Sequence, residues 1–179
     1  MNRQQLEHLI RAAAANADTR DLVVIGSQAI LGTYPEAAPE LLTSIEADVF
    51  PRDNPAASIL IEGAIGERSI FHATYGYYAH GVDEKTATLP TGWQGRLVPV
   101  RNENTRGATG WCLEVHDLAV SKIAAGREKD LGFVRLLFSR GLAQAGVVQE
   151  RLSETAFETT IVRKVAAERL QRLAAEREL

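Results

Sequence analysis

Two acidic side chains, Glu46 and Asp48, have the type and spacing of metal ligands. They lie in residues 44–50, whose pattern predicts a strand that stops at Pro51. Alternate side chains of a strand share a face, so Glu46 and Asp48 are expected on the same face as Ser44. Neighbouring like charges on a strand face repel each other. A bound divalent cation would relieve this repulsion, and so would an exposed edge strand that leaves both acids in water.

The segment before this strand predicts a strand, a tight turn and a helix. Leu22–Ile25 is a continuous apolar run, which is typical of a strand buried on both faces. The run ends at Gly26 and Ser27. A helix is expected to begin at Gln28, with Ser27 as its N-cap.

Further elements must hold these residues in place. Short strands are predicted at Tyr77–His80, Leu97–Val100 and Trp111–Leu113, and helical periodicity begins at Asp117. A capping-box pattern at residues 155–158 predicts a long amphipathic helix after it. We therefore expect an α/β (α+β) fold, with a small mixed sheet flanked by helices in residues 1–116. Residues 117–179 are expected to form a helical C-terminal part packed on this core.

Composition excludes several classes of protein. The 179 residues contain one cysteine, Cys112, so neither an intramolecular disulfide nor a cysteine zinc cluster can form. No apolar run is long enough to span a bilayer, and the N-terminus lacks the pattern of a secretory signal. The net charge is −3, with fourteen acidic against nine basic residues before residue 117 and nine against eleven from there on. We expect a cytoplasmic protein without a membrane partner, and neither part has the basic excess of a generic nucleic-acid binder.

Other reactive side chains carry little signal. The spacing of His72, His80 and His116 fits neither a zinc site nor a nucleophile–base pair, so structural roles are expected. Cys112 lies in an apolar strand and is expected to be buried rather than nucleophilic.

Two blocks together resemble the nucleotidyltransferase superfamily. The first is VVIGSQAILG followed by TSIEADVF, a Gly-Ser turn after one strand and two acids on the next. The second is CLEVHDLAVSKIAAGREKDLGFVRLLF, which is similar to the helical segment of AbiEii-like toxin nucleotidyltransferases and of related bacterial domains of unknown function. There an acid-Leu pair opens a helix, a lysine follows, and an Arg-Asp group comes one to two turns later.

The resemblance implies specific roles for these residues. Gly26 and Ser27 would hold the phosphates of a nucleoside triphosphate, and Glu46 and Asp48 would bind Mg²⁺ or Mn²⁺. By the same resemblance Lys122 and Arg127 would bind phosphate, and Asp130 would be a catalytic base or orienting group. The implied reaction moves a nucleotidyl group to a tRNA end or a protein hydroxyl, in a toxin–antitoxin or phage-defence setting with an antitoxin-like partner. The long C-terminal helix could serve a homodimer or pack on its own chain.

Departures from the family pattern keep a second interpretation open. Glu46 stands where aspartate is usual, Leu42 where many relatives have arginine, and Phe133 where the toxin relatives repeat aspartate. A third metal carboxylate is not evident, with Asp83 and Glu114 the nearest candidates. The alternative function is a non-catalytic module of the same fold that binds a nucleotide or a protein, or a purely structural interaction protein. In a structural interpretation Lys122 extends from a half-buried helix face, Asp130 is a first-turn acid, and Arg127 is a solvated helix charge.

Overall fold

The computed structural model describes residues 1–176 and divides the chain into two units. The first unit combines Met1–Thr86 with Leu97–Glu114, and the second combines Ala87–Arg96 with the chain from Val115 onward. The expected boundary between residues 116 and 117 therefore falls two residues inside a helix that begins at Val115. Residues 87–96, placed with the core by their sequence position, group with the C-terminal helices instead.

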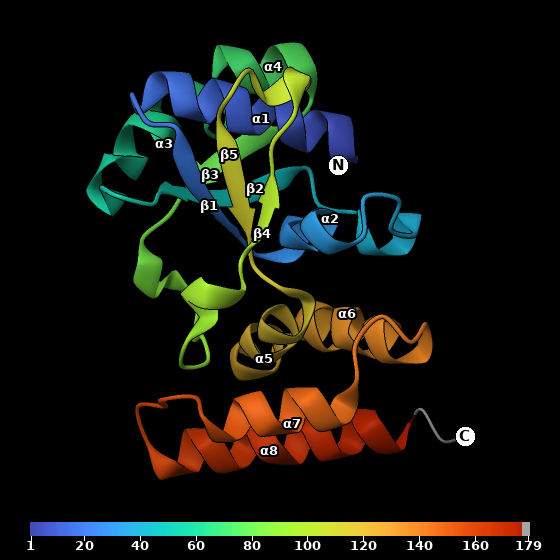
Figure 1. The fold of residues 1–179 in the computed structure, drawn as a ribbon. Helices are drawn as coiled ribbons and strands as arrows, with labels where there is room; N and C mark the ends of the chain where they lie inside the picture. Colours follow the sequence, from blue (N-terminus) through green and yellow to red (C-terminus); the bar gives the residue numbers. More distant parts are fainter. Residues whose placement is uncertain (177–179) are drawn as a thin grey trace. The chain divides into compact units, whose positions relative to one another are not determined.

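The first unit is built on a five-stranded mixed sheet (Figure 1). Its strands lie in the order β3-β2-β1-β5-β4, where β1 pairs with β2 antiparallel and with β5 parallel, β2 with β3 parallel, and β4 with β5 antiparallel. The α/β fold with a small mixed sheet flanked by helices is thus confirmed. The strands are β1 (Asp21–Ile25), β2 (Glu46–Pro51), β3 (Tyr78–Gly81), β4 (Val98–Val100) and β5 (Thr109–Cys112).

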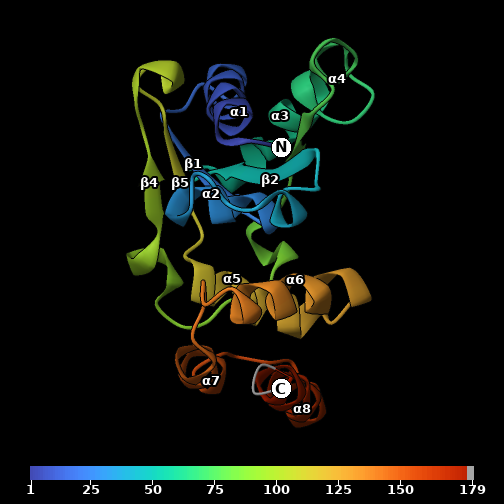
Figure 2. The ribbon, with the colours of Figure 1, turned by 90° about the vertical axis from the view of Figure 1, so that its right-hand side faces the viewer.

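Helices cover both faces of this sheet. Helices α1 and α3 contact β2 and β3 on one face, while α2 contacts β4 and β5 on the other (Figure 2). The helices of this unit are α1 (Arg3–Asn16), α2 (Ile30–Thr33), α3 (Ser58–Ile65) and α4 (Ile70–Tyr75). Short 3-10 helices occupy Ser27–Ala29, Pro39–Leu41, Pro55–Ala57, Glu84–Thr86 and Glu103–Thr105. Because β1 lies between two sheet neighbours and two helical layers, Leu22–Ile25 is buried on both faces, as its apolar run predicts.

The second unit is a cluster of four helices. It contains α5 (Val115–Ala125), α6 (Glu128–Ser139), α7 (Ala145–Ser153) and α8 (Thr160–Ala175), with a 3-10 helix at Trp93–Arg96. Leu118, Ile123, Leu137 and Phe138 are fully buried between them. Gly126 (φ 66°) ends α5, since its left-handed backbone favours glycine. Within residues 1–176 each helix is too short or too polar to cross a membrane.

The predicted capping box at residues 155–158 is wrong. The helix α8 begins at Thr160, and Thr159 caps it by accepting a hydrogen bond from the Val162 N–H at 3.2 Å. Thr155 is instead buried, and its hydroxyl donates to the carbonyl of Arg151 at 2.8 Å. The sequence offers two Ser/Thr starts four residues apart, and packing of Thr155 excludes the first.

Cys112 is buried, as its apolar surroundings predict. Its side chain on β5 has no exposed surface, and Gly32 of α2 lies so close that a Cβ there would overlap the Cys112 side chain. Burial raises the pKa of the thiol to about 12. The thiol is therefore inert in the folded protein.

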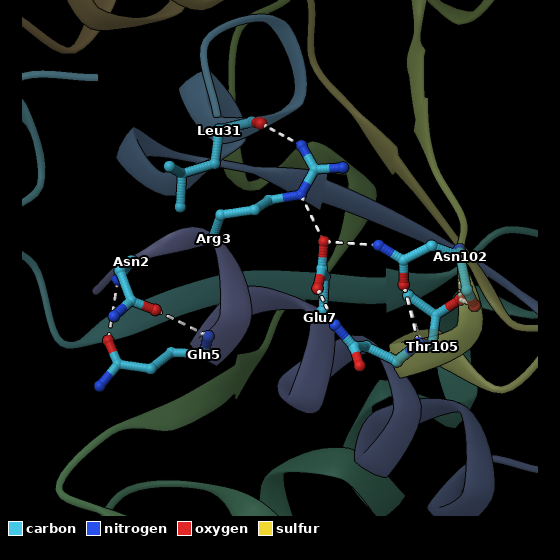
Figure 3. A network of polar contacts seen from close by, with 8 residues as sticks. Asn2, Arg3, Gln5, Glu7, Leu31, Asn102 and Thr105 are labelled. Atoms are coloured by element: carbon cyan, nitrogen blue, oxygen red, sulfur yellow. Dashed lines mark hydrogen bonds and ion pairs between the residues drawn. The ribbon is translucent and has the colours of Figure 1, made fainter. Parts of the chain in front are cut away.

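A buried carboxylate, Glu7, ties α1 to the loop between β4 and β5 (Figure 3). Glu7 is 4% exposed, and Arg3 Nε donates to its Oε1 at 2.8 Å. The Asn102 and Asn104 side-chain amides donate to its two oxygens at 2.7 and 2.8 Å. The polar composition of residues 101–110 predicts a mobile loop, but Asn102 also caps the 3-10 helix Glu103–Thr105, and residues 109 and 110 begin β5. The loop is therefore anchored at Asn102 and Asn104.

We expect the Glu7→Gln variant to lose about 1.5–3 kcal/mol of unfolding free energy at pH 7, the usual value of hydrogen bonds to a charged group. Burial alone would raise the pKa of Glu7, but the hydrogen bonds from Asn104, Arg3 and Asn102 lower it below its ordinary value of 4.5. The carboxylate therefore stabilises the fold fully above pH 4.5, and this contribution disappears as the pH falls through the lowered pKa.

Urea unfolding of wild type and Glu7→Gln at pH 7 and pH 3 checks this prediction. The difference in unfolding free energy should shrink at pH 3, while Glu103→Gln, an exposed acid on the same loop, should change little at either pH. A difference for Glu7→Gln that does not vary with pH would contradict the assigned role.

Candidate functional site

The predicted acid pair lies on an interior strand. Strand β2 is hydrogen-bonded to β1 on one side and β3 on the other, so the edge-strand interpretation of the acids is wrong. Glu46 and Asp48 are half-buried and alternate with the fully buried Ala47 and Val49. The two carboxylates therefore share one face, as the strand period predicts.

Gly26 meets Asp48 where β1 ends. The register pairs Ile25 with Asp48, and Gly26 follows immediately. Its backbone (φ 70°, ψ −173°) lies in a region that is essentially restricted to glycine. A Cβ on Gly26 would overlap Asp48 Oδ2. Glycine at this position thus leaves room for the Asp48 carboxylate directly beside the turn. This explains why the Gly-Ser turn has a glycine at position 26.

The role predicted for Ser27 as N-cap is wrong. Gly26 occupies the cap position, no side chain caps this end, and Ser27 is the first residue of a 3-10 helix that continues into α2. The whole helical segment Ser27–Thr33 is short, so its dipole is weak. Any contact of phosphate here depends on the glycine turn and the Ser27 backbone and hydroxyl.

Two residues of β3 complete the acid pair, and sequence reasoning missed both. The parallel register places Tyr78 opposite Glu46 and His80 opposite Asp48. The Tyr78 hydroxyl donates to Glu46 Oε2 at 2.8 Å, and His80 Nδ1 lies 3.0 Å from Asp48 Oδ1. The sequence contains two pairs with the same i, i+2 spacing, Glu46-x-Asp48 and Tyr78-x-His80. The contact between the two pairs can be predicted only when the β2–β3 register is known.

These partners fix the position of the carboxylates. Burial, followed by the hydrogen bond to Glu46, raises the pKa of Tyr78 well above its ordinary value. The phenol therefore remains a proton donor to Glu46 over the physiological range. His80 is exposed, with about half of its side chain in solvent.

A buried amide lies beside the turn. Gln28 is 1% exposed, and its Nε2 donates to the Ser44 carbonyl at 3.3 Å. Its Oε1 is buried and has no hydrogen-bond partner among the described residues.

The donor set fits a hard cation with two protein carboxylates. Magnesium in nucleotide sites is bound by one or two carboxylates and completed by water and substrate phosphates. Glu46 and Asp48 supply two such groups, and Gly26 leaves the approach to Asp48 open. Across residues 1–176 no group of three or more His, Cys, Asp or Glu side chains gathers around a point, so neither Asp83 nor Glu114 completes a three-ligand site.

Three further predicted residues lie together in the second unit. Lys122 Nζ is 2.8 Å from Asp130 Oδ1, and Arg127 Nε is 2.6 Å from Asp130 Oδ2. Asp130 is fully buried and Lys122 is 8% exposed, whereas Arg127 is largely in solvent. The Lys122 ammonium also lies 5.5 Å from the ring centroid of Phe133, which gives the family departure at that position a cation–π contact.

Asp130 lies in the first turn of α6, as the structural interpretation predicts, and it is also the buried partner of two cations. Burial alone would raise its pKa, but the hydrogen bonds from Lys122 and Arg127 lower it. The catalytic role of Asp130 stays a prediction.

A second buried aspartate, Asp117, has the same character. It opens α5 with no exposed surface, and Arg96 binds both of its oxygens at 2.9 and 3.0 Å. Arg151 of α7 donates to Oδ1 at 3.0 Å. The two buried aspartates of the second sequence block, Asp117 and Asp130, thus join α5, α6, α7 and the segment before β4 within this unit.

The fold and the acid pair define a class of protein. A mixed sheet with a Gly-Ser turn facing a Glu-x-Asp strand is the frame of the nucleotidyltransferases that both sequence blocks resemble. The family described as "Nucleotidyltransferase of unknown function (DUF6036)" matches residues 4–172, and the chain belongs to this family. Comparisons with curated proteins and with solved structures gave no match.

Proposed function

We propose that the protein is a metal-dependent nucleotidyltransferase that uses a nucleoside triphosphate as donor. The observation that carries the proposal is the approach of Gly26 to Asp48, with Glu46 on the same strand face. A glycine turn beside two carboxylates supplies phosphate contact and cation ligation at one place. Membership of the nucleotidyltransferase family supports this class of reaction.

In the proposed reaction the acceptor hydroxyl attacks the α-phosphorus and its proton passes to a base or to water. A new oxygen–phosphorus bond forms, the bond to the β-phosphate bridging oxygen breaks, and pyrophosphate leaves. Glu46 and Asp48 would hold Mg²⁺ or Mn²⁺, which when bound neutralises phosphate charge and orients the acceptor oxygen. Tyr78 and His80 would orient the two carboxylates through the hydrogen bonds described above.

The remaining roles are extensions of this proposal. Gly26 and Ser27 would contact the triphosphate, and Lys122 and Arg127 would stabilise phosphate charge. A tRNA end or a protein hydroxyl is the proposed acceptor, and a toxin–antitoxin or phage-defence setting is the proposed context. The residue roles, the acceptors and the biological context in this paragraph come from the family resemblance alone.

A nucleotide-binding titration tests the site. Calorimetry with ATP, CTP, GTP and UTP, each with Mg²⁺ and with EDTA, should show for one nucleotide a gain in affinity in Mg²⁺ over EDTA. Asp48→Asn and Glu46→Gln should each weaken this binding at least about tenfold, since each removes a cation ligand. Asp53→Asn, which removes an exposed acid shortly after the same strand, is the matched control and should bind like wild type. Folded protein that binds none of the four, or variants that bind equally well, would refute the site.

A non-catalytic nucleotide-binding module is the second candidate. It is favoured by the fact that the described residues offer no third carboxylate to the pair. Release of pyrophosphate from the nucleotide that binds, in the presence of tRNA or protein acceptors, distinguishes the two candidates. Binding without pyrophosphate release would favour the module.

A further inference from the structure

A cavity in the first unit lies at the opposite end of β1 from Gly26. It has a volume of about 560 Å³ and is lined by the last turn of α1, the residues entering β1 and the loop entering β5. Strand β1 runs from Asp21 to Ile25, so its five residues separate this cavity from the Gly26 turn by about 16 Å. The volume is that of a small-molecule site.

Three arginines surround this cavity in a unit that is otherwise acidic. Arg11 comes from α1, Arg20 from the residue before β1, and Arg106 from the loop before β5. Asp18 is the acidic residue of the lining, and it forms no ion pair with any of the three in the part of the chain that the structure describes. The local charge is therefore positive, although the whole chain carries −3.

The donors in this cavity are largely unused. Within residues 1–176 the Arg20 and Arg106 guanidinium groups make no hydrogen bond or ion pair. Arg11 uses one nitrogen to donate to the Asn104 carbonyl at 2.8 Å. Arg106 and Gly107 both have a left-handed backbone, with φ of 50° and 86°. The Gly107 N–H likewise has no hydrogen-bond partner among the described residues. The lining therefore holds several N–H donors that have no acceptor partner among the described residues.

The walls of this cavity are held before any ligand enters. Asn104 accepts from Arg11 and donates to the buried Glu7, so the loop that carries Arg106 is anchored to α1. The Thr109 N–H donates to the Arg20 carbonyl at 2.7 Å, which fixes the entry of β1 against β5. A preformed donor set loses less entropy on binding.

We infer that this cavity is a binding site for a small molecule that carries a polyphosphate group. Guanidinium groups match phosphate oxygens through paired hydrogen bonds, and three of them favour clustered rather than single charges. Ala14, Ala15 and Ala108 line the remainder of the cavity and leave room for an apolar or heterocyclic moiety. The net acidic charge of the chain gives no extended basic track, so a small ligand is favoured over a nucleic acid. This inference does not depend on the proposed transfer reaction.

Binding of inorganic triphosphate in EDTA tests the site without the metal centre. Calorimetry should detect binding to wild type, and the double variant Arg20→Gln/Arg106→Asn should weaken it at least about tenfold, because both sets of charge-assisted hydrogen bonds are lost. Asparagine is chosen at position 106 because it tolerates the left-handed backbone. The Gly107 amide resonance should shift during the titration and locate the ligand.

Two variants serve as controls. Arg101→Gln removes an exposed arginine at the start of the same loop that does not line the cavity, and it should bind like wild type. Asp48→Asn should also retain binding, which separates this site from the acid pair.

Three outcomes would overturn the inference. The first is no binding of triphosphate to folded wild type, and the second is an equal loss in Arg101→Gln, which would indicate general charge attraction. The third is a single-stranded RNA oligonucleotide that binds at least about tenfold tighter than triphosphate and depends on Arg20 and Arg106. That result would make the arginines a nucleic-acid contact.

Discussion

Replacing Asp130 with alanine is expected to lower the free energy of unfolding by about 3–5 kcal/mol, the usual cost of breaking a buried ion pair from one side. The Lys122 side chain is only 10% exposed, and Asp130 is its hydrogen-bonded counter-charge at 2.8 Å. Removing the carboxylate leaves the buried ammonium with the ring face of the buried Phe133 as its remaining partner among the described residues. Arg127 contributes less, because most of its side chain lies in solvent, where water and salt screen it.

Urea unfolding followed by circular dichroism checks this prediction. Lys129→Ala, which removes an exposed charge one residue away, should change the free energy by less than about 0.5 kcal/mol. Adding Lys122→Met to Asp130→Ala should restore part of the loss, since an apolar side chain replaces the unpaired ammonium. If Asp130→Ala behaves like Lys129→Ala, the pair does not stabilise the second unit.

Replacing Gly26 with alanine is expected to weaken magnesium-dependent nucleotide binding on the order of 100-fold. The added Cβ occupies the space of Asp48 Oδ2, so the carboxylate must rotate away from the turn and from His80. Loss of a cation ligand is expected to cost several kcal/mol, and each 1.4 kcal/mol is a factor of ten in affinity. The unusual backbone at Gly26 adds about 1–3 kcal/mol of destabilisation.

The matched control is Gly63→Ala. Gly63 lies in the helix α3, where a Cβ meets no atom within 4 Å, so alanine should leave binding unchanged and stabilise the helix slightly. Calorimetry and thermal melting of the two variants separate the effects. Wild-type affinity in a folded Gly26→Ala variant would show that the Gly26–Asp48 contact has no part in nucleotide binding.

Sequence periodicity predicts the sheet better than it predicts the helix ends. The buried run at Leu22–Ile25 and the alternation around Glu46 and Asp48 follow from local geometry, and both are confirmed. Cap positions are less determined, because Ser27 and Thr155 have suitable side chains but the backbone of Gly26 and the burial of Thr155 decide otherwise. Local side-chain chemistry permits several residues as the N-cap of a helix, and tertiary packing determines which one is used.

The parts of the site that sequence reasoning missed all depend on contacts between distant segments. Tyr78 and His80 lie 32 residues from their partners Glu46 and Asp48, and only the parallel β2–β3 register joins them. Lys122 and Asp130 are eight residues apart and lie on two different helices. They meet because Gly126 ends α5 and the chain turns into α6. Such contacts cannot be inferred from spacing along one element.

The buried thiol of Cys112 is an intrinsic reporter of local opening between α2 and β5. With a pKa of about 12, roughly one thiol in 10⁴ is ionised at pH 8, and the side chain has no exposed surface. A disulfide reagent can therefore react only after α2 and β5 separate. Since the chain has one cysteine, the labelling rate measures that single local opening without any engineered probe. Ligand binding at the Gly26 turn, which leads directly into α2, should slow the reaction and make occupancy visible as kinetic protection.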